Sequence, residues 1–203
     1  MKTSALLAAS CALMAFTPFY AQAGAAKSNA TTTIQFQIPV SAGARSCLPH
    51  AVGYVSDHTT GPVEYLSVYV TGLPPNTDFD FFIIQAPTAP FGLAWYQGDL
   101  ETDSHGNGSG FFIGRFSIET FIVAPGVTSA PVVFSGPFPD ANKNPATPPV
   151  QLYHLCLWFN NPSDAQRAGC ANTVTPFDGE HIAGNQVLNT AQCTTIGPLA
   201  GLP

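Results

Sequence analysis

Apolar and polar residues alternate along much of this chain, and a period of two is typical of strands with one buried face. In the range 63–71, leucine and valine fall on one side and tyrosine and serine on the other. In the range 78–85 the alternation gives way to apolar residues on both faces, which predicts a central strand. By the same criteria we predict strands at 32–40, 51–55, 63–71, 78–85, 111–116, 119–123, 132–135, 150–159 and 186–188, with a turn-rich connection at 56–62.

A helical pattern is clear at one place, 162–168. Asn161 precedes it as an N-cap, Pro162 stands at its first position, and Gly169 follows as a stop signal. Charged residues make up 9% of the chain, which also contains 18 glycines and 19 prolines, so long surface helices are disfavoured. We therefore predict an all-β fold, an antiparallel β-sandwich with one short helix near 162–168.

The segment 70–80 reads VTGLPPNTDFD. It resembles the corner of fibronectin type III and related immunoglobulin-like sandwiches, where Leu-x-Pro-x-Thr precedes an aromatic strand. Here the corner aromatic is Phe79, which lacks the hydroxyl of a tyrosine corner, and the chain exceeds the roughly 100 residues of such domains. The glycine-rich segment 102–110 resembles hairpin tips of bacterial extracellular immunoglobulin-like modules. As a whole the chain resembles exported bacterial proteins without an assigned activity. The resemblances imply an elaborated sandwich of immunoglobulin-like or jelly-roll type.

The N-terminal residues carry the features of an export signal. Lys2 is followed by an apolar run at 5–16 and by an Ala-Gln-Ala triplet, which predicts cleavage after Ala23. The run is too short to span a bilayer, so we expect a secreted or periplasmic protein without a membrane span. The alternative is acylation at Cys11, within an Ala-Ala-Ser-Cys box typical of lipoproteins, but it leaves too short an apolar region before the cysteine.

This organisation predicts a signal peptide at 1–23, a flexible leader at 24–31 and a single domain at 32–203. Seven prolines at 124–149 predict an ordered crossover within that domain. Removal of the signal takes one lysine away and leaves five basic residues against twelve acidic ones, a net charge of −7. A chain of this charge is repelled by nucleic acid and by anionic lipid, so we expect neither as a partner.

Four cysteines remain after cleavage, and an even number in an exported chain predicts two disulfides with three connectivities open. We predict a bond between Cys156 and Cys170, which closes a local loop over the short helix. We predict a second bond between Cys47 and Cys193, which ties the N-terminal region to the tail. A bond between Cys47 and Cys156 is the inter-sheet alternative.

The connection at 87–99 places three aromatic residues, Phe91, Trp95 and Tyr96, between prolines and glycines on a loop or short edge strand. If these rings are exposed, they form a stacking surface of the kind that sugar and peptide binders use. The alternative is that Phe91 and Trp95 close one open end of the sandwich.

Metal ligands are suggested by one short run of oxygen-bearing side chains, Asp99, Glu101, Asp103 and Asn107. Alternating oxygen ligands are typical of calcium loops, but a serine and a glycine stand where such a loop needs its glycine and its bidentate glutamate. The histidines show no metal-binding spacing, and a blue-copper set lacks its methionine once the signal is removed. We expect no cofactor, with calcium as the weaker alternative to a solvated acidic hairpin.

No Gly-x-Ser-x-Gly nucleophile motif occurs in the chain. We predict a non-catalytic exported protein with a binding, adhesion or envelope-structural role, whose partner is polysaccharide, cell-wall material or a protein surface. The alternative is a small secreted hydrolase that uses paired carboxylates about 5 to 9 Å apart. Buried, partnered carboxylates in a cleft would favour the hydrolase, and dispersed surface acids the binding protein.

Overall fold

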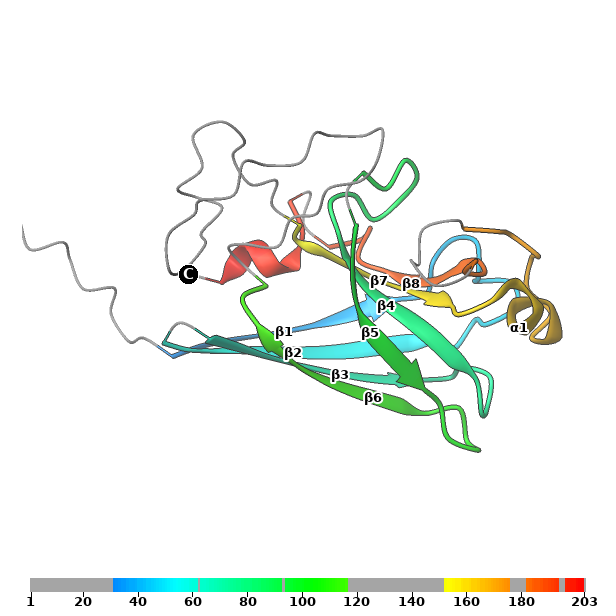
Figure 1. The fold of residues 1–203 in the computed structure, drawn as a ribbon, viewed down its shortest axis with the longest axis horizontal. Helices are drawn as coiled ribbons and strands as arrows, with labels where there is room; N and C mark the ends of the chain where they lie inside the picture. The colour runs from blue at the N-terminus through cyan, green and yellow to red at the C-terminus, as the bar shows by residue number, and fades with distance from the viewer. Residues whose placement is uncertain are drawn as a thin grey trace, which may run out of the picture.

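The computed structural model describes residues 31–61, 63–92, 94–116, 152–175, 182–193 and 196–202. Two four-stranded antiparallel sheets pack face to face as a sandwich (Figure 1). Sheet 1 has the order β1-β2-β3-β6 and sheet 2 the order β5-β4-β7-β8. The strands are β1 (Thr32–Pro39), β2 (Val52–Thr60), β3 (Val63–Thr71), β4 (Asp78–Ile84), β5 (Ala94–Glu101), β6 (Gly108–Gly114), β7 (His154–Phe159) and β8 (Gln186–Asn189). The predicted all-β sandwich is confirmed.

Sheet 1 follows from the alternating pattern of its strands. In β3 the inward side chains Leu66, Val68 and Val70 are buried, whereas Ser67 and Tyr69 are exposed. The predicted turn at 56–62 is wrong, because β2 continues to Thr60 and the chain reverses at Gly61, whose φ is +60°. The polar residues that suggested a turn belong to the strand and alternate between its two faces.

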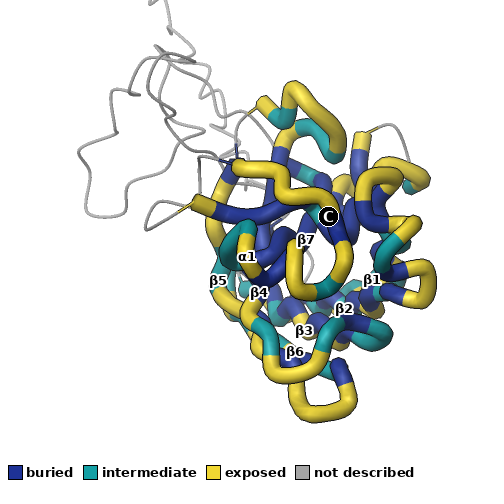
Figure 2. The backbone as a smooth tube through the Cα atoms, turned by 90° about the vertical axis from the view of Figure 1, so that its right-hand side faces the viewer, coloured by how far each residue is buried: buried dark blue, intermediate teal, exposed yellow. Residues whose placement is uncertain are grey.

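Sheet 2 has apolar residues on both faces of its two central strands. All six residues of β7 are buried, and so are six of the seven residues of β4. The prediction that 78–85 forms a central strand is confirmed, since β4 lies between β5 and β7. In Figure 2 the buried stretches follow β4 and β7 through the middle of the molecule, whereas the turns are exposed.

The corner between β3 and β4 carries the chain from sheet 1 to sheet 2. Gly72 begins it at a φ of +72°, where a Cβ atom would lie 2.3 Å from the carbonyl oxygen of His50. The hydroxyl of Thr102 accepts a hydrogen bond from the backbone N–H of Thr77 at 3.0 Å and donates to the carbonyl of Pro74 at 2.7 Å. This buried threonine therefore satisfies corner groups of the kind that a tyrosine hydroxyl serves elsewhere.

The segment 102–107 returns the chain from β5 in sheet 2 to β6 in sheet 1. The Asp103 carboxylate accepts hydrogen bonds from the backbone N–H groups of His105 and Asn107, at 2.8 and 2.9 Å. The carbonyl of Asp103 also accepts from the N–H of Asn76 at 3.0 Å, so this turn and the β3–β4 corner brace each other.

The short helix α1 (Pro162–Arg167) follows β7 as the sequence predicts. The Asn161 side chain accepts a hydrogen bond from the N–H of Asp164, and Gly169 follows the helix at a φ of +77°. Close to the C-terminal end, the 3₁₀ helix η2 (Pro198–Gly201) places Leu199 in the core between the sheets.

The disulfide joins Cys47 to Cys170, so both predicted pairs, Cys47–Cys193 and Cys156–Cys170, are wrong. Cys156 and Cys193 are free. The reason lies in the alternation of β7, which points Cys156 to the outer side of sheet 2, where it packs beside Phe82 and Trp158. Cys170 lies at the main core, within reach of Cys47.

Several predictions fall outside the described residues. They are the signal peptide at 1–23, all but the last residue of the leader at 24–31, the crossover at 124–149 and the strands at 119–123 and 132–135. Within the ranges that the structure describes, no helix is long and apolar enough to cross a membrane.

Candidate functional site

The outer face of sheet 1 carries a surface site to which all four of its strands contribute. The strand register aligns its outward side chains in rows that cross the sheet from β1 to β6. One row is Gln37, Tyr54, Tyr69 and Ser109, and the next is Gln35, Ser56, Ser67 and Phe111. Neighbouring rows are about 7 Å apart, because each is two residues further along the strands.

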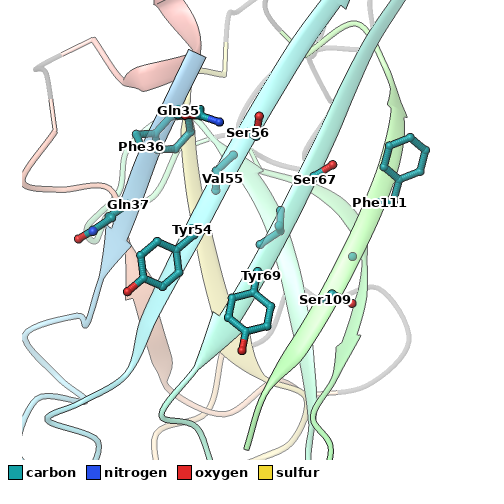
Figure 3. A pocket seen from close by; sticks show the side chains of 12 residues that line it. Gln35, Phe36, Gln37, Tyr54, Val55, Ser56, Ser67, Tyr69, Ser109 and Phe111 are labelled. Atoms are coloured by element: carbon teal, nitrogen blue, oxygen red, sulfur yellow. The ribbon is translucent and has the colours of Figure 1, made fainter. Parts of the chain in front are cut away.

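These rows form a groove of about 880 Å³ across all four strands, which we call the sheet 1 groove (Figure 3). Tyr54 and Tyr69 stand side by side with their ring centroids 6.3 Å apart, and the small Ser56 and Ser67 lie next to them. Phe111 stands at the β6 side, where its ring stacks on Tyr65 at 6.1 Å and 22°. The shape therefore arises from large rings around a strip of small side chains.

The three aromatic rings of the groove are exposed because they project from the outer face of sheet 1. Tyr54, Tyr69 and Phe111 are 44%, 47% and 60% exposed, whereas the inward residues Val55 of β2 and Leu66 of β3 are buried in the core. Exposed rings in such numbers on one surface are typical of interaction sites. Because the strands fix the backbone and the cross-strand neighbours restrict the side chains, a ligand would meet rings that are already in position.

The polar groups of the groove are open to a ligand. Among the residues that the structure describes, the side chains of Gln35, Gln37, Ser56, Ser67, Ser109, Tyr54 and Tyr69 make no hydrogen bond to another protein group. The outward side chains of the four strands also include no aspartate, glutamate, lysine or arginine. The groove is thus an uncharged surface with free donors and acceptors beside aromatic rings.

The structure does not bring the three predicted aromatic residues to one surface. Trp95 and Tyr96 are exposed, but they are consecutive on β5 and therefore point to opposite faces. Tyr96 packs its ring against Phe82 at 5.5 Å and donates a hydrogen bond to Asp99 at 2.5 Å. Phe91 packs edge-on against Trp158 at 5.2 Å, and both residues line a pocket of about 510 Å³ at the outer side of sheet 2.

The predicted calcium ligands lie closer together. Asp99, Glu101, Asp103 and Asn107 line one pocket of about 570 Å³, together with Tyr69 and Ser109 of the sheet 1 groove. The carboxylate of Asp103 accepts hydrogen bonds from backbone N–H groups of its own turn, which lower its pKa. The side chain of Asn107 accepts a hydrogen bond from the hydroxyl of Thr71 at 2.6 Å. Over the described ranges, no three histidine, cysteine, aspartate or glutamate side chains group as a metal site requires. Calcium binding here stays a prediction.

Two carboxylates are buried on the inner face of sheet 1. Asp57 is 0% exposed and Glu64 2%, on adjacent strands one diagonal apart in the register. Burial, and then the negative charge of Glu64, raise the pKa of Asp57 to about 7. Raised pKa values are typical of catalytic acids. However, neither carboxylate lines the sheet 1 groove or the pocket formed by Asp99, Glu101 and Asp103. Because both are buried, a substrate has no access to them.

The sequence analysis did not identify the groove residues, although the alternation of one strand contained part of the signal. The alternation at 63–71 places Tyr65 and Tyr69 on the polar face of that strand. What the sequence does not give is the register that sets Tyr54 beside Tyr69 and Ser67 beside Phe111. Those residues are brought together by strand pairing between segments far apart in the chain.

The sequence matches no protein-family model, and comparison with curated proteins finds no significant match. The site must therefore be interpreted from its own chemistry.

Proposed function

We propose that this protein is a non-catalytic binding protein whose ligand lies in the sheet 1 groove. One observation carries the proposal: five glutamine and serine side chains, which form no hydrogen bond among the described residues, stand beside the three exposed rings of Tyr54, Tyr69 and Phe111 on one sheet face. A surface serving only solubility has no need of such rings, since charged residues do that at lower risk of aggregation. A binding, adhesion or envelope-structural role fits this arrangement.

An exported location, which we also propose, fits this role. The disulfide between Cys47 and Cys170 is typical of proteins in oxidising compartments. Together with the signal-like N-terminal sequence, it supports a secreted or periplasmic location. Outside the cytoplasm the partners within reach are polysaccharide, cell-wall material and the surfaces of other proteins.

We also infer that the sandwich is of the immunoglobulin-like type. The neighbours β2–β3–β6 in sheet 1 correspond to strands A, B and E of that fold, and β5–β4–β7–β8 to C′, C, F and G. Strand β1 extends sheet 1 beyond this pattern. Under this correspondence the corner at 72–77 lies between B and C, whereas the tyrosine corner lies between E and F.

The alternative of a hydrolase with paired carboxylates has less support. Asp57 and Glu64 lie on adjacent strands and both are buried, and Asp80, the cross-strand partner of Asp99, is buried as well. The acids Asp99, Glu101 and Asp103 lie at the surface, where their side chains serve turns or face water. A general acid must reach the group to which it gives its proton, and the buried pair does not.

The proposal is tested by retention on immobilised ligands. Wild-type protein, Tyr69→Ala and the matched control Tyr96→Ala would be passed over neutral polysaccharides, a proline-rich peptide and phenyl-agarose. We expect at least one matrix to retain the wild type and Tyr96→Ala but to release Tyr69→Ala. Both tyrosines are partly exposed, at 47% and 38%, and only one lines the groove. Retention by no matrix, or equal retention of all three proteins, would contradict the proposal.

A further inference from the structure

We propose that the ligand of the sheet 1 groove is a linear polysaccharide without charged groups, an inference that rests on the groove being the binding site. The two rows of side chains described above offer both aromatic faces and groups that donate and accept hydrogen bonds. A sugar ring has an apolar face of C–H groups and a rim of hydroxyls, so it matches both kinds of surface at once.

Hydrogen-bond chemistry favours a polyhydroxylated ligand. Serine and tyrosine hydroxyls donate and accept, and the carboxamides of Gln35 and Gln37 add two donors and an acceptor each. Sugar hydroxyls have the same dual character, so each can pair with any of these groups. A purely apolar ligand would cover seven polar side chains without replacing their hydrogen bonds to water, which costs binding free energy.

Charge selects among polysaccharides. The outward side chains of sheet 1 provide no cation to pair with a carboxylate or sulfate. Next to the groove, Asp99, Glu101 and Asp103 line a pocket that shares Tyr69 and Ser109 with it. Hydrogen bonds from backbone N–H groups lower the pKa of Asp103, so that end of the groove stays negative. An acidic polysaccharide would be repelled there, whereas a neutral one would not.

The position of the groove on a sheet face argues against a peptide. Peptides that bind sheets pair with edge strands through backbone N–H and C=O groups. In the sheet 1 groove, the backbone groups of β2 and β3 are used within the sheet, so only side chains meet the ligand. Proline-rich peptides, which dock on aromatic grooves, remain the alternative for the test to separate.

The groove also has the extent of a chain-binding site. It reaches from Gln35 and Gln37 on β1 to Ser109 and Phe111 on β6, the two edges of the sheet. Three strand spacings separate these edges, about 14 Å in all, which exceeds a single sugar ring. The site therefore suits several consecutive sugar units that cross the strands.

The test uses soluble probes and affinity electrophoresis of the full mature protein. The probes are three neutral polysaccharides (hydroxyethylcellulose, galactomannan and arabinoxylan), acidic polygalacturonate, and polyproline. We expect at least one neutral polysaccharide to retard the protein and polygalacturonate not to do so. A tenfold rise in salt should leave the retardation unchanged, because no ion pair forms.

Two variants separate the contributions of ring and hydroxyl. Tyr69→Ala should weaken binding at least about 5-fold because a ring contact is lost, and Tyr69→Phe by about 2- to 5-fold because the ring stays. The control Tyr96→Ala should bind as the wild type does. Correct folding of each variant is checked by its melting temperature.

The possible failures are distinguishable. If polyproline or polygalacturonate binds in a way that Tyr69→Ala abolishes, the groove is a binding site but the ligand class is wrong. If a neutral polysaccharide binds and neither Tyr69→Ala nor Tyr69→Phe weakens this binding, the ligand class is right but the binding site lies elsewhere on the protein. The assignment of the site to the groove would then be wrong. If no probe binds, the inference is overturned.

Discussion

The two sheets of the sandwich differ most at their outer faces. The outer face of sheet 1 holds Tyr54, Tyr69 and Phe111 in solvent, with free polar groups beside them. The outer face of sheet 2 buries Phe82 and Trp158, whose rings meet edge-on at 5.2 Å, and Phe91 packs against the same tryptophan. Aromatic residues occur on both faces, but Phe82 and Trp158 are buried in sheet 2, whereas Tyr54, Tyr69 and Phe111 of sheet 1 are exposed.

This difference shows why an aromatic side chain is a poor indicator of function until its face is known. In β3 the tyrosines alternate with buried valine and leucine, so the outer face stays open. In β4 and β7 apolar residues occupy both faces, and the outer one is covered as well as the inner one. The same residue type therefore contributes to stability or to recognition according to the strand that carries it.

The largest expected effect separates the two faces by stability. Trp158→Ala should lower the free energy of unfolding by about 3 to 5 kcal/mol, because Trp158 is 1% exposed and its loss leaves a cavity. Tyr69→Ala should lower it by no more than about 1 kcal/mol, because that residue is 47% exposed and its ring mainly loses a cross-strand contact with Tyr54. Urea unfolding with the disulfide intact measures both. Similar losses of unfolding free energy for the two variants would contradict the claim that the rings stabilise one outer face and are exposed on the other.

A second prediction concerns pH and uses the inner face of sheet 1. Asp57 has a pKa of about 7 in the folded protein and 3.8 as its ordinary value, so the folded state binds more protons between these two pH values. The free energy of unfolding should therefore fall as pH rises from about 4 to 7, by at most about 4 kcal/mol, and change little above. Asp57→Asn should remove this dependence.

Binding by the groove should not follow the same pH profile, because its outward side chains include no carboxylate. Melting temperature and retention by the neutral probe would be measured across the same pH series. If retention tracks the titration of Asp57 while the protein stays folded, the groove and the buried pair are coupled and the two should not be treated as independent.

A third, smaller effect is expected where the sheets are joined. Thr102→Val keeps the shape of the side chain but removes the hydroxyl. The N–H of Thr77 and the carbonyl of Pro74 then lose their hydrogen bonds to it. We expect a loss of about 1 to 3 kcal/mol in the free energy of unfolding. Thr71→Val, whose hydroxyl bonds Asn107 at a part-buried position, is a control expected to lose less. A neutral outcome for Thr102→Val would mean that water replaces the hydroxyl.

Much of the fold could be predicted from the sequence, because the strands follow local alternation. The ranges 32–40 and 63–71 match β1 and β3 closely, and the helix caps at Asn161 and Gly169 are confirmed. The end of β2 was missed because Asp57 places a carboxylate on an inner face, where alternation predicts an apolar residue.

The disulfide and the site could not be predicted in this way, because both depend on contacts between distant segments. The spacing of Cys156 and Cys170 allows a bond, but the face of β7 on which Cys156 lies prevents it. Similarly, Phe91, Trp95 and Tyr96 are close in the sequence, but Trp95 and Tyr96 are consecutive on β5 and so point to opposite faces of sheet 2. The sheet 1 groove exists only through the pairing of β2, β3 and β6.

The central claim is that ligand binds to the outer face of sheet 1 and not to that of sheet 2. The most direct measurement is NMR chemical-shift mapping of isotope-labelled protein, titrated with oligosaccharides cut from the neutral probe that binds best. We predict shift changes at the amides of Ser56, Ser67 and Phe111, and none at Phe82 or Trp158. Shift changes confined to β4, β5 and β7 would contradict the account.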